Sequence, residues 1–398
     1  MPVEGDTSTC MALRCTRRDM IRATAMAALS LASSNMIGAA GEAPTHESPD
    51  CVGPLYRGIQ GLAELPYFKP AGEHNLRCVI DDIAGGIDGH THLALNCFLG
   101  PHPDLLARPG DTRYYLGMND WISLECYMNK NQTQHVRRMM REALTDMIMP
   151  WGSRVTATHT IPNLIREMDL LGIEQAVVFP IATGMSIGDN MTERYRDAIQ
   201  RSGYDSRFIL CASVKPTEPD AADKVRHYHA AGYRGIKLHP NFSRFYPDDP
   251  KAWPCYEAMA ECGLPVLIHC GRTGQEPKGG IGAIVYSEAY SDISHFEAPV
   301  AAFPGLKFVL CHAGALQNEG AVAIAKRHQN VWLDIQGQGV SAIRRMINEV
   351  GADRLMFGSD FPFYPIATLL ARLLVATERD RKTRRMILRE NARRFWGV

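Results

Sequence analysis

Residues 235–270 read GIKLHPNFSRFYPDDPKAWPCYEAMAECGLPVLIHC, with short apolar runs on either side of an amphipathic segment that stops at Gly263. Apolar runs of this length, bounded by glycine and proline, are typical of buried strands. Glycine is a common residue at the end of a helix. A strand, a helix and a second strand in this order predict a β-α-β unit with parallel strands.

The same alternation continues on both sides, from residue 86 to the end of the chain. Eight apolar runs can be counted, and helical periodicity follows each of them. They are 87–93, 175–180, 208–214, 235–239, 265–270, 307–312, 331–336 and 355–360. Eight strand-helix units without a dinucleotide-binding G-x-G-x-x-G motif predict an α/β fold of the closed (β/α)8 TIM barrel type, with an open α/β sheet as the alternative.

One connection is far longer than the others. About sixty residues, 94–158, lie between the first apolar run and the first regular helix, whereas βα connections usually have about 2–6 residues. This inserted loop contains a predicted helix near 133–147. Because it follows a barrel strand, we predict a lid or substrate wall at the catalytic face, with an oligomer contact as the alternative. Residues 41–85 lack clear periodicity and are predicted to pack on the exterior of the barrel formed by 86–398.

The first forty residues have the layout of a signal peptide. Arg17 and Arg18 precede an apolar run of small residues, 23–32, and the small residues at 38–40 offer a cleavage site before Gly41. The arginine pair resembles a twin-arginine signal and predicts export of the folded protein to the periplasm. The run is too short for an ordinary membrane span, so none is expected in the mature form. A disordered or anchoring N-terminus is the alternative.

Composition indicates a globular protein that acts on a small molecule. The chain has 43 Lys and Arg against 43 Asp and Glu, so no basic surface for nucleic acid is expected. Its 45% hydrophobic residues suffice for a large core. The 11 cysteines include no C-x-x-C pair and are predicted to be mostly buried thiols. By strand alternation, Cys270 and Cys311 should point away from neighbouring histidines.

Histidines and one aspartate stand at the ends of four apolar runs. His90 and His92 are two residues apart and therefore share one face of a strand. His269, His312 and Asp360 each end another run. The C-terminal strand ends of a barrel converge on its mouth, where enzymes of this fold carry out their chemistry. Imidazole and carboxylate groups in this arrangement predict a site for a divalent metal ion.

These strand ends belong to five motifs in the chain. They are DGHTH at 88–92, GIKLHP at 235–240, LIH at 267–269, CHAG at 311–314 and FGSDFP at 357–362. As a set, they resemble the amidohydrolase superfamily, in the amidohydrolase-related (amidohydrolase 2) branch that includes aminocarboxymuconate-semialdehyde decarboxylase-like enzymes. The resemblance covers residues 86–398.

The resemblance implies roles for the strand-end residues. His90, His92, His269 and Asp360 match the ligands of one divalent metal ion, with zinc expected. Asp360 also matches the carboxylate that exchanges a proton with the metal's water. His312 matches an electrostatic or acid–base group beside the metal. We therefore take Asp360 and His312 as the candidate catalytic residues.

Three further residues are candidates for contact with the substrate or with a second ion. Lys237 shares a strand face with His239, and in binuclear relatives a lysine of this strand is carboxylated and bridges two metals. Hydrogen bonding to substrate or to a carboxylate is the preferred role of Lys237, so one metal is predicted. Arg272 follows His269 on a loop of the catalytic face and could clamp a substrate carboxylate, or be a plain surface residue.

The predicted function is metal-dependent hydrolysis of a small-molecule amide, lactone or ester. This reaction needs only metal-activated water and an acid–base residue. Nonoxidative decarboxylation of an unsaturated or aromatic carboxylate at the same site is the alternative, toward which the branch resemblance leans. A catalytically silent barrel that binds a ligand is the third hypothesis. Substrate, metal identity and oligomeric state stay open, although barrels of this branch often form homodimers.

Overall fold

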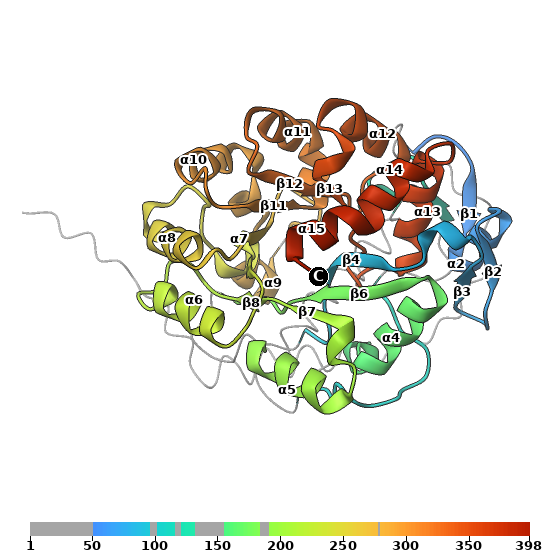
Figure 1. The fold of residues 1–398 in the computed structure, drawn as a ribbon, viewed down its shortest axis with the longest axis horizontal. Coiled ribbons are helices and arrows are strands. Elements are labelled where there is room, and N and C mark those ends of the chain that lie inside the picture. Colours follow the sequence, from blue (N-terminus) through green and yellow to red (C-terminus); the bar gives the residue numbers. More distant parts are fainter. Residues whose placement is uncertain (1–50, 96–101, 116–120, 132–154, 184–190, 278) are drawn as a thin grey trace, which may run out of the picture. The chain divides into compact units, whose positions relative to one another are not determined.

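A ring of parallel strands surrounded by helices is the central feature of the computed structural model (Figure 1). The structure describes residues 51–95, 102–115, 121–131, 155–183, 191–277 and 279–398. The expected signal peptide, its cleavage site and the expected helix near 133–147 lie outside the described residues. No helix in the described ranges is long and apolar enough to cross a membrane.

Nine short strands form the ring. They are β4 (Gly86–Thr91), β6 (Ile173–Val178), β7 (Phe208–Leu210), β8 (Ala212–Ser213), β9 (Ile236–Leu238), β10 (Val266–His269), β11 (Phe308–Cys311), β12 (Val331–Asp334) and β13 (Leu355–Met356). Parallel pairing joins β8 through β13 in sequence order and, separately, β4, β6 and β7. Only Cys211 separates β7 from β8, so these two are halves of one barrel strand.

The ring closes between its first and last strands. The backbone N–H of Gly89 donates to the carbonyl oxygen of Phe357 at 2.8 Å, and the N–H of Asp360 donates to that of His90 at 2.8 Å. Thr91 and Phe361 form an additional parallel bridge. With β7 and β8 counted as one strand, the eight predicted apolar runs coincide with the barrel strands. The predicted TIM barrel is confirmed.

Helices alternate with the strands as the sequence pattern requires. Around the ring lie α4 (Ile161–Leu170), α5 (Thr192–Ser202), α6 (Ala221–Ala230), α8 (Trp253–Cys262), α10 (Glu297–Ala302), α11 (Asn318–Arg327), α12 (Val340–Glu349) and α13 (Ile366–Ala376). Shorter helices are α2 (Gly58–Gly61), α7 (Pro240–Ser243), α9 (Gly280–Val285), α14 (Arg381–Arg385) and α15 (Asn391–Trp396). Gly263 ends α8 with φ of 66°, a left-handed conformation that glycine adopts without a steric cost.

Apolar side chains fill the barrel from within. Ile87, Val177, Leu267 and Val309 pack together inside the ring, and Trp396 of α15 packs against the same cluster. In Figure 1, α15 lies over the centre of the strands. Because this end is closed by the C-terminal helix, the opposite end, where the strands have their C-termini, is the one available for a site.

The segment before the barrel is joined to the inserted loop. Strand β1 (Leu55–Arg57) pairs antiparallel with β5 (Trp121–Ser123), while β2 (Phe68–Pro70) pairs with β3 (Leu76–Cys78). A disulfide links Cys51 to Cys126 across a sequence separation of 75. The six other described cysteines are thiols, four of them buried, so the prediction of mostly buried thiols missed this one bond.

Arg372 of α13 binds the backbone of the inserted loop through its guanidinium. Its buried guanidinium donates to the carbonyl oxygens of Cys126 at 2.8 Å, Gly337 at 2.7 Å and Gln338 at 3.0 Å through Nη1. Through Nη2 it donates to that of Ser123 at 2.9 Å. These bonds satisfy four backbone acceptors and hold residues 121–131 against the loop that follows β12.

Glu167 of α4 should make folding depend on pH. It is buried against the hydroxyl of Tyr114, and burial raises the pKa of its carboxyl from 4.5 to about 7. The pKa of Glu167 is higher in the folded protein than in the unfolded chain. The contribution of its protonated carboxyl to the free energy of unfolding is therefore complete below pH 4.5 and is lost as the pH rises through 7. At pH 8, Glu167→Gln should be more stable than the unaltered chain by up to about 3 kcal/mol.

Urea unfolding at pH 4 and pH 8 measures this difference. Glu193→Gln, which alters an exposed carboxylate of α5, is the control and should change stability equally at both pH values. If the change in stability relative to the unaltered chain depended on pH equally in both variants, Glu167 would be ruled out as the source of the pH dependence.

Candidate metal centre

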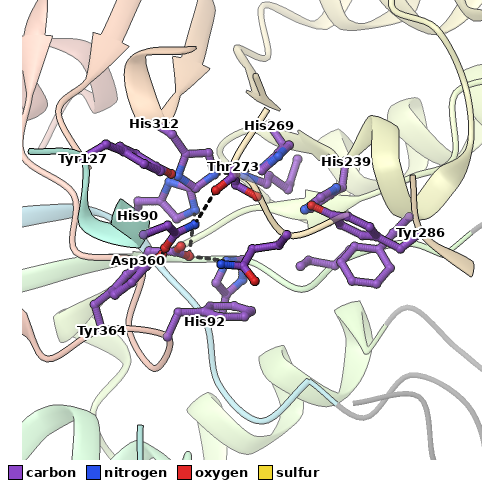
Figure 2. A pocket seen from close by; sticks show the side chains of 16 residues that line it. His90, His92, Tyr127, His239, His269, Thr273, Tyr286, His312, Asp360 and Tyr364 are labelled. Atoms are coloured by element: carbon purple, nitrogen blue, oxygen red, sulfur yellow. Dashed lines mark hydrogen bonds and ion pairs between the residues drawn. The ribbon is translucent and has the colours of Figure 1, made fainter. Parts of the chain in front are cut away.

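The five predicted strand-end residues meet at the mouth of the barrel (Figure 2). All five are buried, with at most 7% of any residue exposed, and they line one cavity. They are His90, His92, His269, His312 and Asp360.

Two histidines of the first barrel strand converge on Asp360. Its Oδ1 lies 3.4 Å from Nε2 of His90 and 3.2 Å from Nε2 of His92. The other ring nitrogen of each is engaged: Nδ1 of His90 lies 2.8 Å from Oδ2 of Asp334, and Nδ1 of His92 lies 2.8 Å from the carbonyl oxygen of Phe179. A carbonyl oxygen can only accept, so Nδ1 of His92 carries the proton and its Nε2 presents a lone pair.

A left-handed backbone brings His312 and Asp360 to the mouth, with φ of 61° and 60°. This explains why the prediction for Cys311 was wrong. Val309 and Cys311 both face the interior, and Sγ of Cys311 lies 3.3 Å from Nζ of Lys237. Simple alternation would have turned His312 outward, but its backbone conformation reverses that direction. Cys270 packs in the core outside the ring, as predicted.

His269 and His312 are in direct contact. Nδ1 of His269 lies 2.8 Å from Nε2 of His312, and Nδ1 of His312 contacts Oε1 of Gln336. Within the described part of the chain, the buried Nε2 of His269 has no hydrogen-bond partner. One ligand atom each from His90, His312 and Asp360 lies within 4.8 Å of the others.

Burial sets the charge of these groups. It lowers the pKa of His92 to about 3 and holds the pKa values of His90 and His269 well below their ordinary value. Burial raises the pKa of Asp360 to about 7. Neutral imidazoles, one carboxylate and the unpartnered Nε2 of His269 form a donor set that fits a divalent cation.

The three other predicted residues differ in their placement. Lys237 and His239 line the cavity, with Nζ of Lys237 lying 4.5 Å above the ring of Phe179. Arg272 does not line it. Its side chain is 55% exposed and pairs with Asp292 at 2.9 Å. Arg272 is therefore placed as the surface alternative expected, and its guanidinium binds Asp292 instead of facing the cavity as a clamp for a substrate carboxylate.

Neutral hydrogen-bonding side chains complete the wall, and the sequence pattern assigned none of them an individual role. They are Tyr127, Asn129, Thr273, Gln275, Tyr286 and Tyr364. The first two belong to the inserted loop and the others to connections beyond β10 and β13. The only available signal was the placement of these connections on the catalytic face of a barrel.

Two side chains, Glu288 and Asn129, hold the loop that follows β10 through hydrogen bonds to its backbone. The carboxylate of Glu288 accepts the N–H groups of Thr273 at 3.0 Å, Gly274 at 3.1 Å and Gln275 at 2.9 Å. Asn129 donates through Nδ2 to the carbonyl oxygen of Thr273 at 3.0 Å. The inserted loop is therefore bonded directly to the opposite wall of the cavity.

A family model described as amidohydrolase matches residues 87–398. The dihydroorotase of Marinobacter nauticus is 27% identical over 144 residues, which are 35% of this chain and 40% of that protein. The chain thus spans about two fifths of the length of this curated relative.

Solved structures share the fold at low sequence identity. An uncharacterized TIM-barrel protein from Bordetella bronchiseptica has a TM-score of 0.53 at 19% identity, covering 66% of this chain and 90% of that one. A 5-carboxyvanillate decarboxylase from Novosphingobium aromaticivorans, complexed with manganese and 4-hydroxy-3-methoxy-5-nitrobenzoic acid, has a TM-score of 0.52 at 17% identity. The match covers 82% of this chain and 100% of the decarboxylase.

Proposed function

Since the chain belongs to the amidohydrolase family, we propose that it is a metal-dependent hydrolase of a small-molecule amide, lactone or ester. The observation that carries the proposal is the approach of two histidine Nε2 atoms to Asp360 Oδ1, at 3.4 and 3.2 Å. His90, His92, His269 and Asp360 would hold one divalent ion, with His312 beside it. Such an ion lowers the pKa of water and polarises a carbonyl group.

Asp360 and His312 carry out the proton transfer and charge stabilisation in this scheme. An ionised carboxylate at this position can accept a proton from the attacking water and return it to the leaving group. His312 is assigned the electrostatic role beside the ion, with both of its ring nitrogens engaged by Gln336 and His269. Tyr127 and Asn129 form a substrate wall, the role predicted for the inserted loop.

A nonoxidative decarboxylase is the second candidate. The structural likeness to 5-carboxyvanillate decarboxylase favours it, whereas the sequence similarity to dihydroorotase favours hydrolysis. Within the described residues, Lys237 is the cationic side chain that lines the cavity, and Arg272 is paired with Asp292. A substrate carboxylate would therefore need Lys237 or the metal for its charge, which keeps hydrolysis first.

Zinc is the proposed metal. The periplasm, reached by export, is the proposed location. Histidine-rich sites accept several divalent ions, and the manganese in the related decarboxylase keeps that ion as the alternative. The twin-arginine-type pattern at Arg17 and Arg18 supports export, and so does the disulfide, because such bonds persist in oxidising compartments.

Elemental analysis of the purified protein tests the metal proposal. We expect about one divalent ion per chain, as a single site requires. His90→Ala and His269→Ala should lose the ion, while His312→Ala should keep much of it and lose rate. Lys326→Ala, which alters an exposed helix residue, is the control. Full occupancy in all three histidine variants, or no metal in the unaltered protein, would contradict the proposal.

A paired screen then identifies the reaction. Acid release from amides, lactones and esters is measured beside carbon dioxide release from aromatic and unsaturated carboxylates, with the same protein preparation. Carbon dioxide release alone would replace the hydrolase proposal with the decarboxylase, and neither product would favour a silent barrel.

A further inference from the structure

Two buried polar side chains, Asp334 and Gln336, have no role in the proposed reaction. Asp334 is the last residue of β12, and Gln336 lies two residues beyond it. They are 1% and 0% exposed. Oδ2 of Asp334 lies 2.8 Å from Nδ1 of His90. Its Oδ1 accepts the backbone N–H groups of His312 at 2.9 Å and Gln336 at 3.1 Å. Asp334 therefore joins the first, sixth and seventh strands at the depth of the metal centre.

The contacts of Asp334 determine which nitrogen of His90 carries the proton. The two backbone N–H groups can only donate, so Oδ1 of Asp334 is an acceptor. With Oδ1 engaged by these two donors, Oδ2 is the oxygen directed at Nδ1 of His90. A carboxylate oxygen can only accept as well. Nδ1 of His90 must then hold the proton, and its Nε2, which lies 3.4 Å from Asp360 Oδ1, presents a lone pair.

Gln336 acts through two histidines in series. Its Oε1 contacts Nδ1 of His312, while its Nε2 has no partner within the part of the chain that the structure describes. An amide oxygen accepts, so Nδ1 of His312 is protonated and its Nε2 is an acceptor. That Nε2 lies 2.8 Å from Nδ1 of His269, which must therefore be the donor.

The series ends on a buried ring nitrogen that has no partner among the described residues. With Nδ1 of His269 protonated, its Nε2 presents a lone pair toward the metal site. The same series leaves Nε2 of His312 occupied by the His269 N–H group. It explains why His269 would bind the ion and His312 would stand beside it.

We propose that Asp334 and Gln336 are positioning residues, which fix the tautomers of His90, His312 and His269 so that Nε2 of His90 and of His269 faces the metal site. This inference rests on the proposed function for the identity of the metal ligands. The tautomers themselves are a property of the metal-free protein and can be measured without turnover.

Asp334→Asn is the variant with the sharpest expectation. Asparagine has the same shape but one acceptor and one donor group. Its oxygen is expected to keep the two backbone N–H groups, so its NH₂ group faces Nδ1 of His90. His90 should then switch to the Nε2–H form and direct a proton at the metal position. Zinc affinity should fall about 10–100-fold.

Gln336 offers a matched pair of variants. Gln336→Glu keeps an acceptor at His312 Nδ1 and should leave all tautomers unchanged and zinc affinity within about twofold. Gln336→Leu removes the acceptor and should release His312 and His269 to the alternative tautomer, with a loss of about 10-fold or more in zinc affinity. Rescue by glutamate separates an effect on tautomers from a general effect of packing.

Nitrogen-15 NMR of histidine-labelled, metal-free protein reads each tautomer, and competition with a chelator gives the Kd for zinc. Asp205→Asn, on an exposed turn, is the control. Nδ1–H forms in the unaltered protein and a switch of His90 in Asp334→Asn support the inference. Nε2–H forms in the unaltered protein, or unchanged tautomers and Kd in Asp334→Asn and Gln336→Leu, overturn it. Correct tautomers without zinc binding would instead contradict the proposed function.

Discussion

Asp360→Asn is expected to lower kcat/KM by about 10⁴-fold or more on the substrate that the paired screen identifies. Asparagine keeps the shape of the side chain but cannot take up a proton, and the substitution removes the carboxylate that lies within 3.4 Å of both histidine Nε2 atoms. Proton transfer and charge balance at the metal are lost together. Metal-free Asp360→Asn should fold at least as stably as the unaltered chain, because it no longer buries an ionisable carboxyl.

Turnover, zinc content and urea unfolding of the same preparation check this result. Asp205→Asn serves again as the control for loss of a carboxylate at an exposed position. If Asp360→Asn keeps as much as a tenth of the activity, proton transfer must be assigned to another group, with His312 as the first candidate.

Gly271→Ala should cause the largest loss of stability. Gly271 follows β10 with φ of 83°, and an added Cβ would lie 1.9 Å from the carbonyl oxygen of Gly314. That oxygen belongs to backbone, so the two connections must move apart. We expect a loss of about 3 kcal/mol or more, from the left-handed conformation and the clash together. Activity should fall as well, because Thr273 and Gln275 follow on the same loop.

Gly232→Ala is the matched control for Gly271→Ala. Gly232 has φ of 86° and nothing within 4 Å of an added Cβ, so it carries the conformational cost without the clash. Its expected loss is about 1 kcal/mol. The midpoint of chemical unfolding compares the two variants. Equal losses would show that contact with Gly314 does not determine the requirement for glycine.

The fold could be predicted because its strands are covered on both sides. A strand buried inside a barrel is apolar along its whole length, so it stands out from an amphipathic helix in one sequence. The site followed from the same pattern, since His269 and Asp360 each end such a run. Their position relative to the strand, rather than their identity alone, indicated convergence at the mouth.

Other features depend on contacts that no local pattern records. Alternation along β11 could not anticipate the positive φ of His312, which turns that side chain toward the interior although Cys311 before it already faces there. Arg272 lies on the expected face, but its pairing with Asp292 depends on a turn twenty residues away. Asp334 lies within the predicted strand 331–336, where a single carboxylate has no spacing motif that would mark it as functional.

The disulfide makes part of the chain a covalent ring. His90 and His92 lie within the segment that the bond between Cys51 and Cys126 closes. In the chain-entropy model, closure of a loop with this separation of 75 contributes about 4 kcal/mol to stability. A protease that cuts once inside the ring would yield no separate fragments until the bond is reduced. The strand with the two histidines would stay tethered to the rest of the barrel through such damage.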